Sequence, residues 1–432
     1  MNSLALEFPQ PNVAQQDYAS QTAVRIILAL LAIRWIAGIA ENFGIPAISE
    51  VSAIFMTGCL FLGFVQHMHL SAKSQTLVLG LLAWMFAAVL SVAANYVGNV
   101  DAVALLALLA LYALFANAAS YNVTSLADLR IIQTFLVAFI IAGTCLAVAQ
   151  IATGSGFVEA GKFDTQRAIG SDVHPVSFAI QMVAALIGLE VIRIKQRHAW
   201  SFGHLILIGL GMLALYLTFA RTAWVMLALC TGLTLFLRAS PLGRILMLAV
   251  IAVSGIALGQ FSGRFSDLTS LPFFFQNFSV SDAVFDYRYV DNSVSWRIVN
   301  WSLGFQQAIE QPWLGFGAGQ SAASSHFQLE MHNIFLETFF EGGIIGLLAF
   351  LLVLCGVVRL HRCLPSTTPA DRHARILANG FGLSLLLAVT FSTSFVDQLM
   401  SVLLYLLMLS ATSVPAATDQ PAASRSAAIL AP

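Results

Sequence analysis

Charged residues are scarce in this sequence. Of its 432 residues, 9% are Asp, Glu, Lys or Arg, whereas a soluble domain carries about 25%. Hydrophobic residues make up 59% of the chain, and its mean hydropathy is +0.84. This composition excludes a soluble globular domain, because lipid must be the solvent for most of the chain. The net charge of -1 gives no electrostatic reason to expect nucleic acid as a partner.

Features of a secreted or zinc-binding protein are lacking as well. The cysteines lie in apolar runs or, for Cys363, in a basic loop, so we expect no disulfides. No Cys/His spacing resembles a zinc site. Residues 1–20 contain no Lys or Arg, so a cleavable signal peptide is not predicted. The first apolar run is expected to be an uncleaved anchor.

Long apolar runs are abundant, and each must be helical because lipid offers no partner to a bare peptide group. We predict an all-α polytopic membrane protein of about 12 transmembrane helices, from the length that a helix needs to cross a bilayer. The predicted spans are residues 23–40, 51–66, 76–94, 102–119, 131–152, 175–194, 202–219, 222–238, 243–261, 333–358, 376–396 and 398–414.

These spans divide the chain into five parts. Residues 1–22 form a predicted cytoplasmic tail, and residues 23–261 hold helices 1–9. A large polar loop follows at 262–331, and helices 10–12 lie within 332–414. The Ala-, Ser- and Pro-rich end, 415–432, is predicted to be a disordered cytoplasmic tail.

The basic residues orient the chain. If the spans alternate in direction, the basic residues lie on one side of the membrane, which we assign as cytoplasmic. Both termini then lie on the cytoplasmic side as well. The basic residues on that side are Lys73, Arg130, Arg193, Lys195, Arg197, Arg238, Arg244, Arg359, Arg362, Arg372 and Arg375. The opposite side receives two longer stretches, 153–174 and 262–331. The second stretch is far longer than a usual helix connection, and such loops are often functional.

The large loop is rich in aromatic residues, which favour the membrane interface. Apolar residues recur there at helical spacing: Val294, Ile298, Trp301, Phe305 and Ile309. A polar stripe runs beside them: Arg297, Asn300, Gly304 and Gln307. We predict an interfacial amphipathic helix with Arg297 on its wetter flank. Pro312 ends it, and the glycines at 315, 317 and 319 predict a mobile turn.

Three ionisable residues at the outer edge of the membrane are candidates for chemistry. Arg221 lies in a very short connection between two spans, Arg297 lies on the amphipathic helix, and His332 opens the tenth span. A guanidinium forms two parallel charge-assisted bonds with phosphate. Histidine titrates near neutral pH and can act as a general base. Two arginines can thus hold a pyrophosphate while the histidine activates a hydroxyl.

Each candidate also has a plain structural explanation. Arg221 can be a snorkelling anchor, and Arg297 can contact lipid headgroups. His332 can cap the helix that follows it. Arg167 and His174 can help to bind donor or acceptor, or can lie in a solvated loop before Pro175 starts the sixth helix.

Other polar and small residues point to structure rather than chemistry. Glu337 and Glu341 are either polar contacts within the bundle or acidic partners of the site arginines, and the structural role is favoured. The glycines at 342, 343 and 346 allow close helix packing. Arg34 and Asp397 lie at or near apolar spans and remain without an assigned role.

From His332 onward the chain resembles a known family. The run His332-Asn333, nine residues, and then the Gly343–Leu347 segment resembles the signature of the O-antigen ligase and O-antigen polymerase (WaaL/Wzy, Wzy_C-type) family of bacterial envelope glycosyltransferases. Asn333, Gly343 and Gly346 are the supporting motif positions. Three further segments resemble the family in its order: around Arg167–Gly170, at Thr218–Arg221, and from Trp296-Arg297 to Gly317. The resemblance covers residues 160–360.

The resemblance implies a GT-C-like enzyme that moves a glycan from undecaprenyl pyrophosphate to an acceptor hydroxyl at the periplasmic face of the inner membrane. It implies no metal, no other cofactor, and inversion at the anomeric carbon. By position, His332 would be the base, and Arg221 and Arg297 would bind the pyrophosphate with help from Arg167.

The acceptor stays open. A ligase transfers the glycan to lipid A-core in lipopolysaccharide biosynthesis, and a polymerase transfers it to a second lipid-linked glycan to build O-antigen or exopolysaccharide. A third branch glycosylates proteins. A transporter or flippase of lipid-linked glycans is the rival from another class. The sequence shows neither the internal repeat nor the paired interrupted helices that transporters often have.

Overall fold

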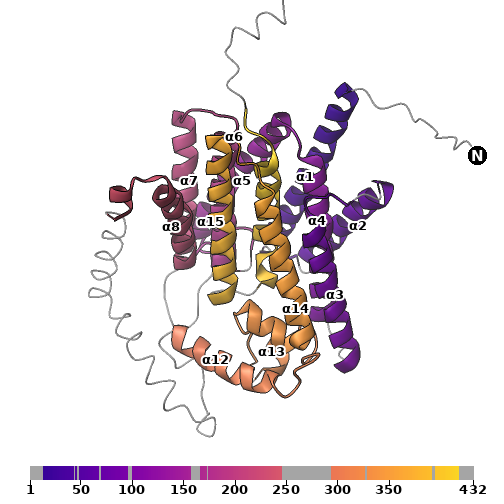
Figure 1. Ribbon diagram of the computed structural model, residues 1–432. Helices are drawn as coiled ribbons and strands as arrows, with labels where there is room; N and C mark the ends of the chain where they lie inside the picture. Colours follow the sequence, from indigo (N-terminus) through magenta and orange to yellow (C-terminus); the bar gives the residue numbers. More distant parts are fainter. Residues whose placement is uncertain are drawn as a thin grey trace, which may run out of the picture.

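The computed structural model describes residues 13–417 except 43, 46–47, 68–69, 96–99, 157–165, 173, 246–292, 326–327 and 392–394. Within these residues the regular elements are helices, packed as a bundle (Figure 1). They are α1 (Val13–Asn42), α2 (Ile48–His67), α3 (Gln75–Asn95), α4 (Val100–Asn122), α5 (Leu126–Thr153), α6 (Pro175–Lys195), α7 (Phe202–Thr218), α8 (Arg221–Arg238), α12 (Ser293–Ala308), α13 (Ser321–Ser324), α14 (Ile334–Arg362), α15 (Pro369–Phe391), the short 3₁₀ helix η3 (Val396–Gln398) and α16 (Leu399–Ser413).

The prediction of an all-helical, multi-span protein is confirmed. Among the described residues, 7 helices are long and apolar enough to cross a membrane, and shorter apolar helices accompany them at Val51–Val65, Phe202–Thr218, Arg221–Leu237 and Leu399–Ser413. Every predicted span but the ninth coincides with a helix. The ninth, 243–261, lies outside the described residues beyond 245. The count of twelve spans is therefore not confirmed.

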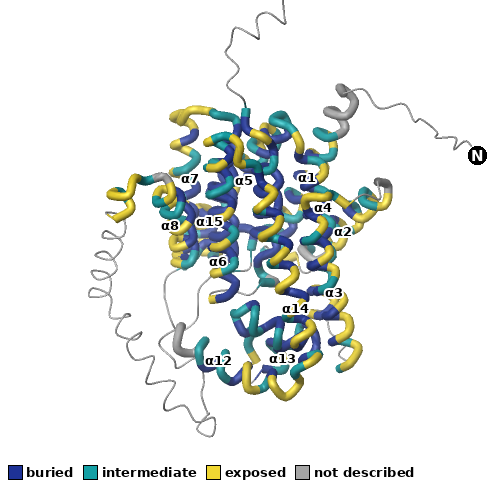
Figure 2. The backbone as a smooth tube through the Cα atoms, in the orientation of Figure 1, coloured by how far each residue is buried: buried dark blue, intermediate teal, exposed yellow. Residues whose placement is uncertain are grey.

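Helix α6 forms the centre of the bundle. It is apolar all round, and nearly its whole length is buried among α5, α7, α8, α15 and α16 (Figure 2). At its last residue, Lys195 Nζ donates to Asp371 Oδ1 (2.7 Å) and to the carbonyl of Val414 (2.6 Å). The N–H of Ala417 returns a bond to the Lys195 carbonyl (3.0 Å). These bonds hold the first residues of the predicted tail 415–432 against the bundle; residues 418–432 lie outside the described part.

Several helices begin earlier than predicted, and in α5 and α15 the reason is a polar cap that precedes the apolar run. Ser125 and Asp128 form a capping box that starts α5 at Leu126 rather than at 131. Thr368 and Asp371 form the same reciprocal pair of hydrogen bonds at the start of α15, which begins at Pro369 rather than at 376. A hydropathy window alone misses such starts.

Helix α12 lies at one end of the bundle together with α13 (Figure 1), where the amphipathic helix was predicted. Its polar stripe faces the protein, which differs from the expected wet flank. Asn300 is 1% exposed and donates to the Glu330 carbonyl (3.1 Å), and Gln307 donates to the Ser324 carbonyl (2.7 Å). Phe305 and Ile309 are each 52% exposed. The polar stripe turns inward because the 324–331 backbone supplies its hydrogen-bond partners, which leaves apolar side chains on the outside.

Candidate functional site at one end of the bundle

Four polar side chains predicted from the sequence lie near the first residues of α6 and α14 and on α12. They are Arg167, His174, Arg297 and His332. His174 is the N-cap of α6, and His332 directly precedes Asn333, the N-cap of α14. Burial lowers the pKa of His174, and the charges of Arg167 and Arg297 lower it further. Burial also lowers the pKa of His332, and Arg297 and His174 add to that effect. The structure therefore brings His174 within electrostatic range of Arg167, Arg297 and His332, and it brings His332 within range of Arg297.

The segment around Arg167 is fixed to the end of α7. Arg167 Nε donates to the Thr218 carbonyl (2.9 Å), and the N–H of Ala168 donates to the Leu217 carbonyl (2.9 Å). Phe219 then turns the chain in the left-handed region (φ 50°), and Arg221 opens α8 with an exposed side chain. Arg221 is therefore three residues after Thr218, whose carbonyl Arg167 contacts.

Arg297 lies against the end of another helix. Its Nη1 donates to the carbonyl of Phe391, the last residue of α15 (2.9 Å). A helix C-terminus carries partial negative charge, so this bond suits a cation. Burial lowers the pKa of Arg297, but a guanidinium remains protonated in proteins. Arg297 is half-buried rather than solvated, which corrects its predicted place on a wet flank.

His332 sits in an unusual backbone conformation, with φ +49°. Few non-glycine residues adopt the left-handed region, and those that do often mark functional sites. Its neighbours hold it there: Asn333 Oδ1 accepts from the N–H groups of Phe335 and Leu336 (3.1 Å each), and Trp301 Nε1 donates to the Met331 carbonyl (2.6 Å).

The ionisation of His332 follows from its surroundings. Burial, and then the charges of Arg297 and His174, lower the pKa of His332 to about 4. The imidazole is therefore neutral at pH 7 and keeps a lone pair that can accept a proton. Its Nδ1 lies 4.0 Å from Glu330 Oε2.

The motif glycines build a break in α14. Gly343 has φ 60° and ψ -159°, and the turn that follows α12 docks into this break. Ile344 N–H donates to the Pro312 carbonyl (2.8 Å), and Phe316 N–H donates to the Phe340 carbonyl (2.9 Å). A Cβ on Gly315 would lie 2.4 Å from the Phe340 oxygen. The glycine-rich turn is therefore packed, and the prediction that it is mobile is wrong.

Polar residues of α3 complete this joint. Ser91 Oγ donates to the carbonyls of Leu314 and Glu341, and Asn95 Nδ2 donates to the Gly315 carbonyl (2.9 Å). Sequence reasoning missed Ser91 and Asn95. The available signal was their polarity near the end of an otherwise apolar span.

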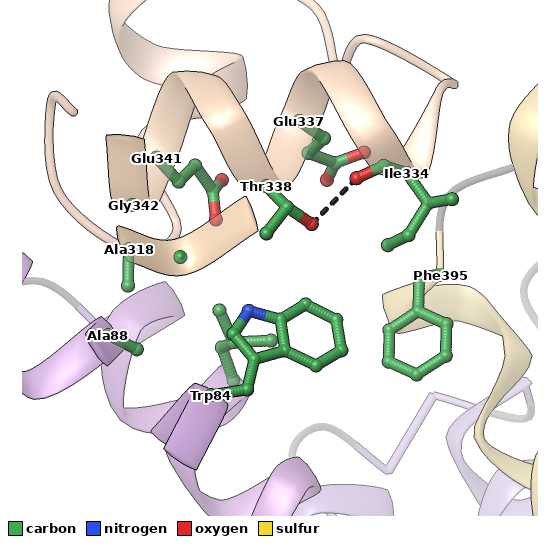
Figure 3. Close-up of a pocket in the computed structure, with 11 residues that line it drawn as sticks. Trp84, Ala88, Ala318, Ile334, Glu337, Thr338, Glu341, Gly342 and Phe395 are labelled. Atoms are coloured by element: carbon green, nitrogen blue, oxygen red, sulfur yellow. Dashed lines mark hydrogen bonds between the residues drawn. The ribbon is translucent and has the colours of Figure 1, made fainter. Parts of the chain in front are cut away.

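A small cavity lies beside the first turns of α14 (Figure 3). Glu337 and Glu341 line it from α14, opposite Trp84 of α3 and Phe395. Glu341 Oε1 accepts from the Ser321 N–H (3.1 Å), and Ser321 Oγ lies 3.4 Å from Glu337 Oε1. Both carboxylates thus contact the start of α13, as expected of polar contacts within the bundle.

Comparison with known proteins agrees with the resemblance in the sequence. Residues 204–351 match the family model described as O-antigen ligase, Wzy_C. This range begins in α7 and ends in α14, so it contains Arg221, Arg297 and His332, whereas Arg167 and His174 precede it. Searches of curated proteins and of solved structures found no significant match. Residues 204–351 of this multi-pass membrane protein are therefore similar to the O-antigen ligase (Wzy_C) domain.

Proposed function

We propose that the protein is an O-antigen ligase-like glycosyltransferase. It moves a glycan from undecaprenyl pyrophosphate to a hydroxyl of lipid A-core at the periplasmic face of the inner membrane. The observation that carries this proposal is a neutral His332 within electrostatic range of Arg297, both inside the segment that matches the family. Lipid-linked glycans are the substrates that this family implies.

The arginines bind the donor. Arg297 and Arg221 bind the pyrophosphate oxygens through bidentate, charge-assisted hydrogen bonds. Arg167 assists from the segment that is hydrogen-bonded to the end of α7. As the glycosidic bond breaks, negative charge grows on the leaving pyrophosphate. Arg167 and Arg297 are half-buried and hydrogen-bonded to carbonyls, so their guanidinium groups stabilise that charge without having to reorganise.

His332 activates the acceptor. Its neutral ring takes the proton of the acceptor hydroxyl while the hydroxyl oxygen attacks the anomeric carbon. A new glycosidic C–O bond forms, the bond from the anomeric carbon to the pyrophosphate oxygen breaks, and undecaprenyl pyrophosphate leaves with that electron pair. Attack opposite the leaving group inverts the anomeric configuration.

Transfer by the purified protein tests the proposal. The donor is undecaprenyl-pyrophosphate glycan, supplied without added metal, with and without lipid A-core. We expect glycan-bearing lipid A-core as the product only when lipid A-core is present. A ladder of lengthening lipid-linked glycan without lipid A-core would instead identify a polymerase that uses the same site. Movement of the intact donor across a vesicle membrane without any transfer would identify a flippase.

Replacing either proposed donor-binding arginine with lysine should weaken binding of the pyrophosphate donor. Arg297→Lys and Arg221→Lys keep the charge but lose the two-pronged geometry. Loss of one charge-assisted bond corresponds to a decrease in kcat/KM of about 10- to 100-fold. The measurement is initial rate against donor concentration. Arg362→Lys, on an exposed residue at the far end of α14, is the matched control. Wild-type kinetics in both site variants would remove these residues from the mechanism.

A further inference from the structure

Trp301 of α12 contacts two separate segments of the candidate site. Its Nε1 donates to the carbonyl of Met331 (2.6 Å), the residue directly before His332. Its ring packs against the ring of Phe391, with centroids 6.0 Å apart and planes at 57°, an ordinary geometry for an aromatic pair. The Phe391 carbonyl in turn accepts from Arg297 Nη1 (2.9 Å), and Arg297 lies one helical turn before Trp301. One side chain therefore connects the residue before the proposed base with the residue that holds a proposed donor-binding arginine.

The backbone before His332 is fixed to α12 at consecutive carbonyls. Asn300, which is 1% exposed, donates to the Glu330 carbonyl (3.1 Å), and Trp301 donates to the next one. The Met331 side chain is fully buried, and a Cβ on Gly304 would lie 2.5 Å from its Sδ. Met331 is therefore held by α12 through its side chain and through its carbonyl.

The Met331 carbonyl matters for the imidazole because it belongs to the peptide unit that ends at the His332 nitrogen. That unit is planar, so the bond from Trp301 fixes the plane from which the φ angle of His332 is measured. At +49° this φ is strained for a residue with a side chain. Asn333 caps α14 on the other side of the histidine. Without the indole N–H, the backbone is free to relax from the strained angle and to turn the imidazole away.

We propose that Trp301 is a positioning residue of the transfer reaction. Its indole N–H orients the imidazole of His332 through the Met331 carbonyl, and its ring supports the Phe391 carbonyl that binds Arg297. The inference rests on the proposed function and deepens it. It assigns to the two contacts of one side chain two different effects on the kinetics.

Two substitutions separate these effects. Trp301→Phe keeps an aromatic ring against Phe391 and removes the N–H, so we expect kcat to fall about 3- to 10-fold, the effect of one hydrogen bond, while the KM for the donor stays within about twofold. Trp301→Leu removes the ring as well and should also raise the donor KM about 3- to 10-fold. The measurement is initial rate against donor concentration at saturating acceptor, expressed per folded protein from thermal unfolding. Trp200→Phe, on an exposed tryptophan between α6 and α7, is the matched control and should change neither constant.

A double-mutant cycle shows whether Trp301 acts through the histidine. His332→Asn lacks the imidazole but tolerates the left-handed backbone. In that background the N–H has no base to orient, so Trp301→Phe should lower the residual rate by no more than about twofold. If Trp301 only contributed to packing, Trp301→Phe would cause the same fold-loss in both backgrounds. The residual rate is measured as product accumulated over long incubations.

Wild-type kcat in Trp301→Phe would overturn the inference, as would equal fold-losses in the two backgrounds. In either case, slow transfer by His332→Asn leaves the proposed function standing and rejects the role of Trp301 alone. If His332→Asn transfers at the wild-type rate, or the wild type makes no glycan product, the proposed function fails and the inference about Trp301 fails with it.

Discussion

Removing the imidazole of His332 should lower the rate of glycan transfer by about 10²- to 10⁴-fold, the usual contribution of a positioned general base. The most informative variant is His332→Asn. At φ +49° an alanine would add backbone strain, whereas asparagine tolerates the left-handed region. His332→Asn thus removes the base and preserves the turn that begins α14.

The measurement is the initial rate of transfer at saturating donor and acceptor, with thermal unfolding to show that the variant is folded. His198→Asn, far from the site at the other end of α6, is the matched histidine control and should keep the wild-type rate. Transfer by His332→Asn at the wild-type rate would show that His332 is not the general base, even though the resemblance to the family implies that role.

The acid limb of the pH profile is a separate prediction for the same residue. Because the pKa of His332 is lowered to about 4, the ring stays in its basic, neutral form as pH falls from 7 to 5. We expect kcat/KM to remain level over that range and to fall only as pH approaches 4. A limb near 6.5, the ordinary value for histidine, would contradict the buried, positively charged setting. In Arg297→Gln the limb should move to higher pH, because one cause of the lowered pKa is removed.

The fold was largely predictable because a segment that crosses lipid must be apolar and must satisfy its own backbone hydrogen bonds. An apolar run of sufficient length must be a helix, so the central helices from α3 to α7 were found within a few residues of their ends. Their starts were less predictable where a polar cap lies outside the run, as Ser125 does before α5. Such a cap fixes the start of the helix through hydrogen bonds to backbone N–H groups, and hydropathy does not reveal it.

The candidate site was predictable as a set of residue types but not as an arrangement. Position at the membrane edge singled out Arg221, Arg297 and His332. The inward turn of the α12 polar stripe was not predictable, because it depends on carbonyls of residues 324–331 that no periodicity reveals. Nor does sequence spacing show that His174 lies near His332, 158 residues away in the chain (332 − 174).

Gly343→Ala should destabilise the protein far more than Gly342→Ala, although the two glycines are adjacent in one helix. Gly343 has φ 60° and ψ -159°, a conformation essentially restricted to glycine, and a Cβ there would lie 2.2 Å from the Trp313 carbonyl carbon. Backbone strain and overpacking together cost about 3–5 kcal/mol. A Cβ on Gly342 meets nothing within 4 Å, so that change should stay within about 1 kcal/mol.

The comparison is made by thermal unfolding and by transfer rate, in the same detergent. Because the break at Gly343 sets the direction of the 334–342 segment that follows His332, Gly343→Ala should also lose activity in whatever fraction remains folded. Equal effects of the two substitutions would mean that the docked turn does not hold α14. In that case the glycine spacing of the family signature would reflect helix packing alone. If only Gly343→Ala fails, the signature fixes the place where α14 bends, and that bend sets the direction of the helical turns that follow His332.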